Sequence, residues 1–446
     1  MNARAVASAS PRLDPPPEVR RIAARLTDAG FETWCVGGAV RDALLGLDHE
    51  GPDWDLATAA TPSEVRALFN RTVPHGIEFG TVGVIDRAGV MHEVTTFRRD
   101  VQHDGRHAVV EFGVSIVEDL ARRDFTINAI AFSPATDELR DPFGGREDLS
   151  RGVVRAVGEP GARMVEDRLR ALRAFRFAGR FGFEIDPATW NAIMESAPFL
   201  PRLSRERVRQ EIEKTLDQVR RPSTALELWR RSGAFASLIP ELAGVPDVAL
   251  RAADLVGTPD ATGRPELAQS RARNRLATLF LDFTAPQARA ALEGLRASNK
   301  ETDWITHQVD SWKQLGGPMR EAIATSSVSD AALRRWASVV GRTRFNDFLR
   351  IATARWTAEA GPGGSALLTP IADMYRRGTR AAWHDPISVG DLAIDGGDLM
   401  DLGIPAGPTV GTVLRQLLDS VLDDPSKNQR ETLLNLAREL AGGLTR

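Results

Sequence analysis

This 446-residue sequence has few features that would predict a disulfide, a membrane span or a secretion signal. Its single cysteine, Cys35, cannot form an internal disulfide, and the apolar stretch around it favours a buried thiol that packs as a small hydrophobic residue. No apolar run approaches the length of a membrane span, so we expect no membrane association. These scarcities predict a protein of the reducing cytoplasm.

Strong net charge is also missing, since the formal sum over the chain is −3. A near-neutral total neither supports nor excludes RNA as a partner, because the local distribution of positive charge decides. Residues 1–16 run into a proline cluster and have no hydrophobic signal core. We expect them to form a disordered leader, with an organelle-targeting peptide as the alternative. The chain is too long for one core, so it should hold two to four domains.

The most informative stretch runs from residue 34 to 58 and has the pattern of strand, turn, helix, turn and strand. Gly37 and Gly38 remove two Cβ atoms where the first strand meets the helix, which leaves backbone N–H groups open to a phosphate. Arg41 follows one turn later, and its planar guanidinium suits paired hydrogen bonds to phosphate oxygens. The ordinary alternative for a glycine pair before a helix is a simple tight turn.

Two carboxylates follow this helix, because Asp53 and Asp55 flank Trp54. In an extended segment residues i and i+2 share a face, so both side chains point the same way, about 7 Å apart along the strand. They repel each other unless a cation lies between them, and Mg²⁺ with triphosphate oxygens completing its shell is the natural candidate. The ordinary alternative for Asp-x-Asp is a solvated loop.

Together, GG-x-V-R-D-x-L-L-G and the D-W-D after it resemble the nucleotidyltransferase motif of the family of CCA-adding enzymes and bacterial poly(A) polymerases. The resemblance implies an α+β fold, in which an N-terminal, polymerase-β-like nucleotidyltransferase head with a mixed sheet is followed by an all-helical neck, body and tail. It also implies a head that binds a nucleoside triphosphate and two metal ions. Gly38 and Arg41 would then meet the nucleotide, and Asp53 and Asp55 the metal.

Local signals predict further elements of the head. Residues 17–29 carry apolar residues at helical spacing before a glycine stop, and residues 62–69 should form a second helix capped by Thr61. Strand signals occur within residues 75–86 and over residues 90–98.

Glu93 lies in the second of these strands, on the face opposite to Val94. It is a candidate third metal ligand, although an outward-facing strand glutamate fits equally well. Similarity to the family's EVTT-x-R element favours the ligand. The polar residues 101–108 resemble a flexible loop of the family, in which Arg106 would touch the substrate; a plain surface hairpin is the alternative.

Residues 118–131 contain R-R-D-F-T-I-N-A, which matches the family's second motif. By that resemblance Arg123 reaches the nucleotide, Asp124 shapes the neighbouring turn and Asn128 helps to recognise the ribose. Without it, the spacing of Asp119 and Arg123 on a helix would indicate ordinary surface ion pairing.

Residues 166–177 are expected to form one helix with four charged residues at a spacing of three. Successive members drift by about 60° around the helix and form a slanted polar stripe. A solvated arginine face is the ordinary interpretation of such a stripe. Its members are Asp167, Arg170, Arg173 and Arg176.

The sequence E-D-x-L-R-x-x-R-A-x-R-F in this stretch resembles the family's third motif, whose acid and first arginine act as a protein template for the incoming base. The chemistry agrees with Asp167 and Arg170 in those roles. A carboxylate accepts from the exocyclic amino group of cytosine or adenine, and a guanidinium donates to the adjacent ring acceptor. Uracil and guanine present a carbonyl instead and leave the carboxylate unpaired. Arg173 and Arg176 are expected to meet phosphates or to hold the stripe in place.

Positive charge gathers in the same part of the chain. Residues 151–231 hold 17 Lys and Arg against 11 Asp and Glu, an excess that suits an RNA backbone. Residues 203–211 resemble a family element that supports the base-reading helix. Residues 392–422 resemble the tail that reaches the corner of tRNA in bacterial CCA-adding enzymes.

The predicted function is addition of C, C and A to the 3′ end of tRNA from CTP and ATP, with Mg²⁺ as cofactor and no obligate protein partner. A bacterial poly(A) polymerase, an enzyme that adds only CC or only A, and a non-catalytic RNA-binding protein remain as alternatives. The predicted domains are a leader (1–16), head (17–155), neck (156–235), body (236–385) and tail (386–446).

Overall fold

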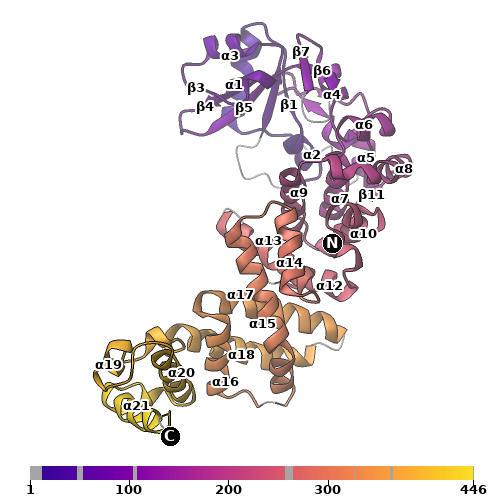
Figure 1. Ribbon diagram of the computed structural model, residues 1–446. Coiled ribbons are helices and arrows are strands. Elements are labelled where there is room, and N and C mark those ends of the chain that lie inside the picture. The colour runs from indigo at the N-terminus through magenta and orange to yellow at the C-terminus, as the bar shows by residue number, and fades with distance from the viewer. Residues whose placement is uncertain are drawn as a thin grey trace. The chain divides into compact units, whose positions relative to one another are not determined.

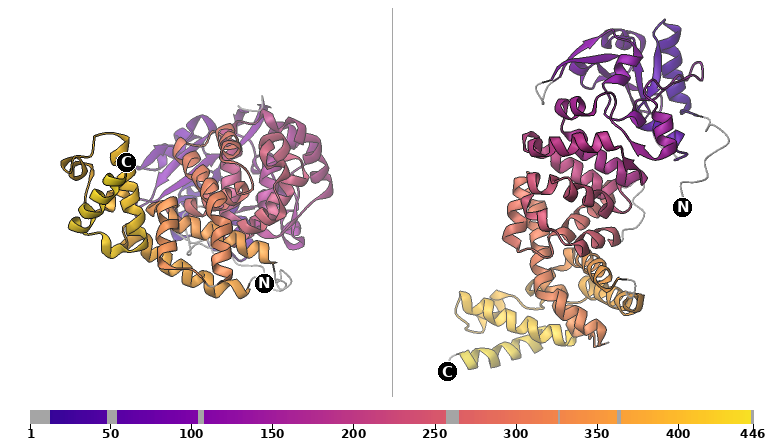
Figure 2. Two further views of the ribbon diagram at one scale, coloured as in Figure 1. Left: turned by 60° about the horizontal axis from the view of Figure 1, so that its bottom comes forward. Right: turned by 90° about the vertical axis from the view of Figure 1, so that its right-hand side faces the viewer.

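The computed structural model of the chain describes residues 13–47, 54–103, 108–256, 265–325, 327–361 and 365–444 (Figures 1 and 2). The chain forms two compact units. The first contains Met1–Glu211 and Leu228–Leu238, and the second contains Ile212–Glu227 and Ile239–Arg446. Most of the predicted leader, residues 1–12, lies outside the described residues.

A seven-stranded mixed sheet organises the start of the first unit, with strand order β3-β4-β5-β2-β1-β8-β9. Only β2 and β5 pair in parallel within it. A separate hairpin joins β6 and β7, and β10 pairs with β11. The strands are β1 (Thr33–Val36), β2 (Asp55–Thr58), β3 (Thr72–Pro74), β4 (Thr81–Ile85), β5 (Met91–Thr96), β6 (Arg98–His103), β7 (Ala108–Phe112), β8 (Ala131–Phe132), β9 (Leu139–Arg140), β10 (Val153–Val154) and β11 (Glu184–Ile185).

Helices pack on this sheet through the buried apolar residues of its strands. Trp34 and Val36 of β1 belong to one core cluster with Leu120 of α4. Helices α1 and α3 pack on β1, β2, β4 and β5 near the top of Figure 1. The helices of the first unit include α1 (Pro17–Asp28), α2 (Gly38–Leu44), α3 (Pro62–Leu68), α4 (Ile116–Ala121) and α5 (Gly145–Arg151), with short 3₁₀ turns η1 (Ile77–Phe79) and η2 (Thr126–Asn128).

The sequence signals for the head elements are confirmed. Helix α3 begins at Pro62, and Thr61 and Glu64 form the reciprocal hydrogen bonds of a capping box. β6 and β7 pair as an antiparallel hairpin, although Arg106 lies in the undescribed residues 104–107. The α+β class, with a mixed sheet followed by helices, is also confirmed.

Helices follow the sheet in the rest of the first unit. They are α6 (Pro160–Glu166), α7 (Leu169–Phe181), α8 (Pro187–Ser196), η3 (Ala197–Arg202), α9 (Arg205–Gln218), α10 (Pro222–Arg231) and α11 (Ala234–Leu238). The end of α9 and the start of α10 lie within Ile212–Glu227 and so belong to the second unit. The single helix expected over residues 166–177 is wrong. Asp167 adopts an extended conformation (φ −145°, ψ 103°) between α6 and α7, and its carboxylate accepts from the backbone N–H of Leu169. An aspartate side chain that bonds the backbone two residues further on competes with the helical hydrogen bonds and so favours a break in the helix.

The described part of the second unit is entirely helical. One core cluster joins α15–α18 with the end of α20, and a second joins α19, α20 and α21. Both views in Figure 2 show α20 and α21 packed side by side. The elements are η4 (Pro240–Gly244), α12 (Asp247–Leu255), α13 (Pro265–Phe280), α14 (Ala285–Gly294), α15 (Asn299–Ala324), α16 (Asp330–Val340), α17 (Arg342–Ala360), α18 (Ser365–His384), η6 (Val389–Asp391), α19 (Gly396–Asp401), α20 (Pro408–Asp423), η7 (Pro425–Lys427) and α21 (Arg430–Leu444).

Among the helices formed by the described residues, none combines the length and the apolar character needed to cross a membrane.

Candidate active site

The turn between β1 and α2 is where several of the predicted site residues meet. Gly37 has φ +80°, a conformation that side chains disfavour, and Gly38 begins α2. A Cβ atom at Gly37 would lie 3.1 Å from Nη1 of Arg123 and 3.6 Å from Oδ2 of Asp55. The backbone of Asp55 pairs with Val36, the residue just before this turn. A candidate nucleotide ligand and a candidate metal ligand therefore border the same glycine.

Asp55 and Glu93 occupy matching positions on neighbouring strands. The parallel register of β2 and β5 places both side chains on the same face of the sheet. Asp55 is exposed, and Oε1 of the partly exposed Glu93 lies 3.3 Å from Nε2 of His75. Two carboxylates on one face supply the oxygen ligands that a hard divalent cation prefers, so these side chains fit a metal ion. Asp53 lies outside the described residues, and its role stays a prediction.

Arg123 is held beside the turn by a buried carboxylate. Its Nη2 lies 3.3 Å from Oδ2 of Asp119, and Nη2 of Arg122 lies 3.0 Å from Oδ1 of the same residue. Asp119 is only 1% exposed, so this is no surface ion pair. Burial alone would raise the pKa of Asp119, but the two arginines and further hydrogen bonds lower it below its ordinary value. Asp119 thus stays charged and fixes Arg123 near Gly37.

Arg41, the predicted phosphate ligand, is buried. Its Nε donates to Oδ1 of Asp42 at 2.6 Å, and its Nη1 donates to Oδ1 of Asn128. The rings of Phe177 and Phe181 lie 5.2 and 4.8 Å from its guanidinium carbon. Burial lowers the pKa of Arg41, and the charge of Asp42 offsets part of that effect. These contacts hold the guanidinium of Arg41 in place, and its role at a phosphate stays a prediction.

Asp124 and Asn128 connect this support to α7. Asn128 donates from Nδ2 to Oδ1 of Asp124 at 2.8 Å, and Arg173 donates from Nε to the other carboxylate oxygen at 2.8 Å. Burial alone would raise the pKa of Asp124, but the charge of Arg173 and the hydrogen bonds that Asp124 accepts lower it to about 2. Both ends of the Asn128 amide are occupied, one by Asp124 and one by Arg41. These contacts fix the second motif against the third.

The two candidate base readers are joined through their backbones, since the N–H of Arg170 donates to the carbonyl of Asp167 at 3.1 Å, but their side chains have other partners. Asp167 is partly exposed, and its Oδ2 accepts from Nη2 of Arg207 at 2.7 Å. Arg170 is buried, and its Nη1 donates to Oε2 of Glu166 at 2.9 Å while both terminal nitrogens also donate to backbone carbonyls. Both carboxylate oxygens of Asp167 and both terminal nitrogens of Arg170 thus already have partners, and the base-reading role of the two residues stays a prediction.

The solvated arginine face is also wrong for α7. Arg176 is buried and donates from Nε to Oε1 of Glu211 at 2.6 Å, because each buried charge needs a nearby opposite charge. Arg180 donates to Oδ2 of Asp42 at 2.9 Å and so joins α7 to α2. Sequence reasoning missed Arg180, although it follows Arg176 by one helical turn. It also missed the contact of Arg207 with Asp167, which local spacing cannot reveal.

Known proteins match this chain along most of its length. A family model described as "Poly A polymerase head domain" matches residues 33–155, and one described as "Probable RNA and SrmB- binding site of polymerase A" matches residues 182–245. The CCA-adding enzyme of Geobacillus stearothermophilus is 35% identical over 419 residues, which make up 93% of this chain and 95% of that relative. The chain belongs to the CCA-adding enzymes.

Other members of the CCA-adding enzymes agree with this assignment. The enzyme of Limosilactobacillus fermentum is 33% identical over 436 residues, covering 94% of this chain and 96% of the relative. A crystal structure of the Bacillus stearothermophilus CCA-adding enzyme in complex with CTP has a TM-score of 0.77 at 32% identity and covers 97% of this chain and 99% of its own. The Thermotoga maritima CCA-adding enzyme complexed with tRNA shares the fold, with a TM-score of 0.64 at 21% identity.

The resemblance predicted from the motifs is therefore confirmed, and so is the class of enzyme. CCA-adding enzymes are tRNA nucleotidyltransferases, and membership of a nucleotidyltransferase family implies the use of a divalent metal ion. The poly(A) polymerase and non-catalytic alternatives are not favoured by these relatives.

Proposed function

We propose that this chain adds C, C and A to the 3′ end of tRNA, with CTP and ATP as donors and Mg²⁺ as the divalent metal. The observation that carries the proposal is the meeting of Asp55 and Arg123 at Gly37. At this glycine the backbone has no side chain. It is bordered by Asp55, a carboxylate suited to a metal ion, and by Arg123, a cation suited to a triphosphate. The CTP complex of the relative from Bacillus stearothermophilus supports the choice of nucleotide.

In the proposed reaction, the RNA 3′ hydroxyl forms a bond to the α-phosphorus of the nucleotide, and the bond from that phosphorus to the pyrophosphate oxygen breaks. Asp53 and Asp55 would hold Mg²⁺, with Glu93 as a third ligand on the same face as Asp55. When bound, the metal would activate the 3′ hydroxyl and stabilise the charge that develops on pyrophosphate. Arg123 would neutralise triphosphate oxygens, and the missing side chains of Gly37 and Gly38 would let the nucleotide approach the backbone.

For base selection we propose Asp167 as the acceptor for the amino group of cytosine or adenine, with Arg170 as the donor to the ring. Arg207 would hold the carboxylate of Asp167 in position until a base arrives. We assign Arg173 and Arg176 to the support of α7 through Asp124 and Glu211, rather than to phosphates. This division leaves the partly exposed carboxylate of Asp167 to distinguish the bases.

We also propose that the chain is arranged as a head (17–155), neck (156–235), body (236–385) and tail (386–446). The first unit ends at Leu238, close to the proposed end of the neck, although Ile212–Glu227 of the proposed neck belong to the second unit. A reducing cytoplasm is the proposed location, since the single thiol, Cys35, is buried and its pKa is raised by burial.

The test is replacement of Asp55 by Asn, which removes the charge and keeps the size of the side chain. We expect incorporation of nucleotides into tRNA to fall by several orders of magnitude, because a metal ligand is lost, while tRNA binding stays near the wild-type level. Asp137→Asn is the matched control, since Asp137 is exposed and has φ +57°, which Asn tolerates. Wild-type turnover in the Asp55 variant would contradict the mechanism.

Sequencing the products decides which nucleotides are added. With tRNA lacking its 3′ end, CTP alone should give CC and both nucleotides should give CCA. Long adenosine tracts would indicate a poly(A) polymerase instead, and CC as the final product with both nucleotides would indicate a partial activity.

A further inference from the structure

An exposed aromatic ring in the first unit holds two guanidinium groups. Phe199 lies in η3 and is 43% exposed. The guanidinium carbon of Arg168 lies 4.6 Å from the centre of its ring, and that of Arg202 lies 5.1 Å from it. We call these three residues the Phe199 platform.

The Phe199 platform carries positive charge without a compensating acid. In the part of the chain that the structure describes, neither Arg168 nor Arg202 forms an ion pair; Arg168 donates only to the hydroxyl of Ser196, at 2.9 Å. Burial and the charge of Arg202 lower the pKa of Arg168. The nearby Arg207, by contrast, pairs with Asp167. Two like charges held together on a ring are unfavourable by themselves, which points to an anionic ligand.

The position of the Phe199 platform indicates which anion it meets. Arg168 directly follows Asp167, the proposed base-reading residue. Residues 151–231, which include the whole platform, have the excess of positive charge noted above. The ring also fixes both guanidinium groups in advance, so fewer side-chain rotamers are lost when a phosphate binds.

We propose that the Phe199 platform binds the phosphate backbone of the substrate RNA, with Arg168 and Arg202 contacting phosphates and Phe199 holding both guanidinium groups in place. This inference rests on the proposed function, because it supplies an anchor for tRNA beside the nucleotide site. It differs from base recognition, since phosphates are common to all RNA sequences.

The decisive experiment measures the dissociation constant for tRNA lacking its 3′ end, at several salt concentrations, for the full-length protein and Arg202→Gln. Each lost phosphate contact should reduce the slope of log K against log salt by about 1. We therefore expect a shallower slope and several-fold weaker binding at low salt. The KM for CTP should stay unchanged, and kcat at saturating tRNA should stay near the wild-type value.

Two further variants and a control separate charge from structure. Arg202→Lys keeps the positive charge and should show the wild-type salt slope. Phe199→Leu keeps both arginines but removes the ring that holds their guanidinium groups, so it should weaken tRNA binding with a smaller change in slope. Arg151→Gln is the matched control, because Arg151 is exposed but paired with Glu147. Thermal unfolding of each variant identifies any loss of folding.

A wild-type salt slope in a folded Arg202→Gln protein would overturn the proposal and leave the platform as a structural cluster or a contact for another protein. The proposed function is judged separately, by whether the wild-type protein adds nucleotides to tRNA. Because the salt slope measures binding alone, a catalytic failure would not alter its interpretation.

Discussion

At the scale of single residues, this protein keeps its charged side chains by pairing them inside the fold. Arg41 and Arg176 are buried and Asp124 is nearly so, and each has an oppositely charged side chain within hydrogen-bonding distance in the same unit. A buried pair of this kind adds little net stability when intact, but removing one partner leaves the other charge uncompensated. Substitutions in this network should therefore affect stability more than their small changes in volume suggest.

Asp124→Asn tests the network through its pH dependence. The depressed pKa of Asp124 means that its ionised form stabilises the folded state, by about 2 kcal/mol from the shift between 3.8 and about 2. This contribution is complete above about pH 5 and is lost as the pH falls towards 2. Urea unfolding should therefore show the variant to be less stable by at least about 2 kcal/mol at pH 7 and pH 5, with a smaller difference at pH 3. A difference that is constant down to pH 3 would contradict the assigned ionisation.

Asp167→Ala tests base selection. If this carboxylate accepts from the amino group of the base, its loss should reduce the preference for CTP and ATP over UTP and GTP by roughly 1–3 kcal/mol, or about ten- to a hundredfold. The measurement is single-nucleotide kcat/KM for all four triphosphates on one primer. If all four rates fall equally, Asp167 supports the site without reading the base.

At the scale of elements, the junction between β1 and α2 combines backbone strain with close approach. Gly37 needs a positive φ, and the space that its side chain would fill is bordered by Arg123 and Asp55. Gly30 also has a positive φ, but within the described part of the chain a Cβ there would meet nothing within 4 Å. A side chain at Gly30 would therefore meet only backbone strain, whereas one at Gly37 would meet both backbone strain and neighbouring atoms.

Gly37→Ala and Gly30→Ala form a matched pair. Both should destabilise the protein, by on the order of 1–2 kcal/mol, because alanine disfavours a positive φ. Only Gly37→Ala should also displace Arg123 and lower kcat for nucleotide addition strongly. Equal activities in the two folded variants would show that the turn does not border the reacting groups.

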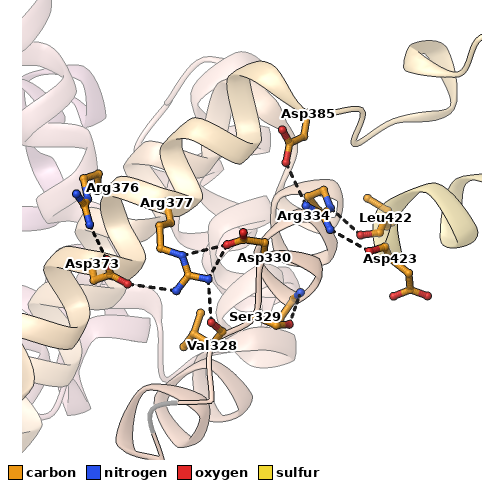
Figure 3. A network of polar contacts seen from close by, with 11 residues as sticks. Val328, Ser329, Asp330, Arg334, Asp373, Arg376, Arg377, Asp385, Leu422 and Asp423 are labelled. Carbon is orange, nitrogen blue, oxygen red and sulfur yellow. Dashed lines mark hydrogen bonds and ion pairs between the residues drawn. The ribbon is translucent and has the colours of Figure 1, made fainter. Parts of the chain in front are cut away.

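At the scale of the whole molecule, a buried arginine joins the last helices to the rest of the second unit. Arg334 of α16 donates from Nε and Nη2 to the backbone carbonyls of Leu422 and Asp423 at the end of α20, and from Nη1 to Asp385 (Figure 3). These acceptors come from two segments, the end of α20 and the residue after α18, and both are well separated from Arg334 in sequence. One side chain thus helps to fix α20 on the proposed body.

Arg334→Met tests whether the proposed tail holds tRNA at a distance from the nucleotide site. Its loss leaves buried acceptors unpaired, at a cost of about 1–3 kcal/mol, and should loosen α20. We expect a higher KM for full-length tRNA and a smaller effect on a short minihelix. Arg335→Met is the control, since Arg335 is more exposed and pairs with Asp419 and Asp423 near the surface. Equal losses on both RNAs would assign Arg334 to folding alone.

The sequence by itself determined the local elements and the chemistry of the head. Gly37 and Gly38 mark the strand-to-helix turn, Thr61 marks a helix start, and alternation places Glu93 on one face, because each signal depends on neighbours within a few residues. The motif resemblance added the family, which the full-length relatives confirmed. Features that depend only on neighbouring residues can be predicted from the sequence without knowledge of the tertiary structure.

Only the tertiary structure decided which charged groups meet. A solvated stripe was the ordinary interpretation of the spacing of Arg170, Arg173 and Arg176, and the motif resemblance was the alternative. In the structure each arginine lies against a carboxylate: Glu166 for Arg170, Asp124 for Arg173 and Glu211 for Arg176. Arg41 is likewise buried beside Asp42, a contact that its motif does not reveal, and its expected role at a phosphate stays a prediction. Partners such as Asp124 and Glu211 lie tens of residues from their arginines, so no local spacing encodes the pairing. Burial and long-range packing decide the role of a charged side chain, and both exist only in the folded chain.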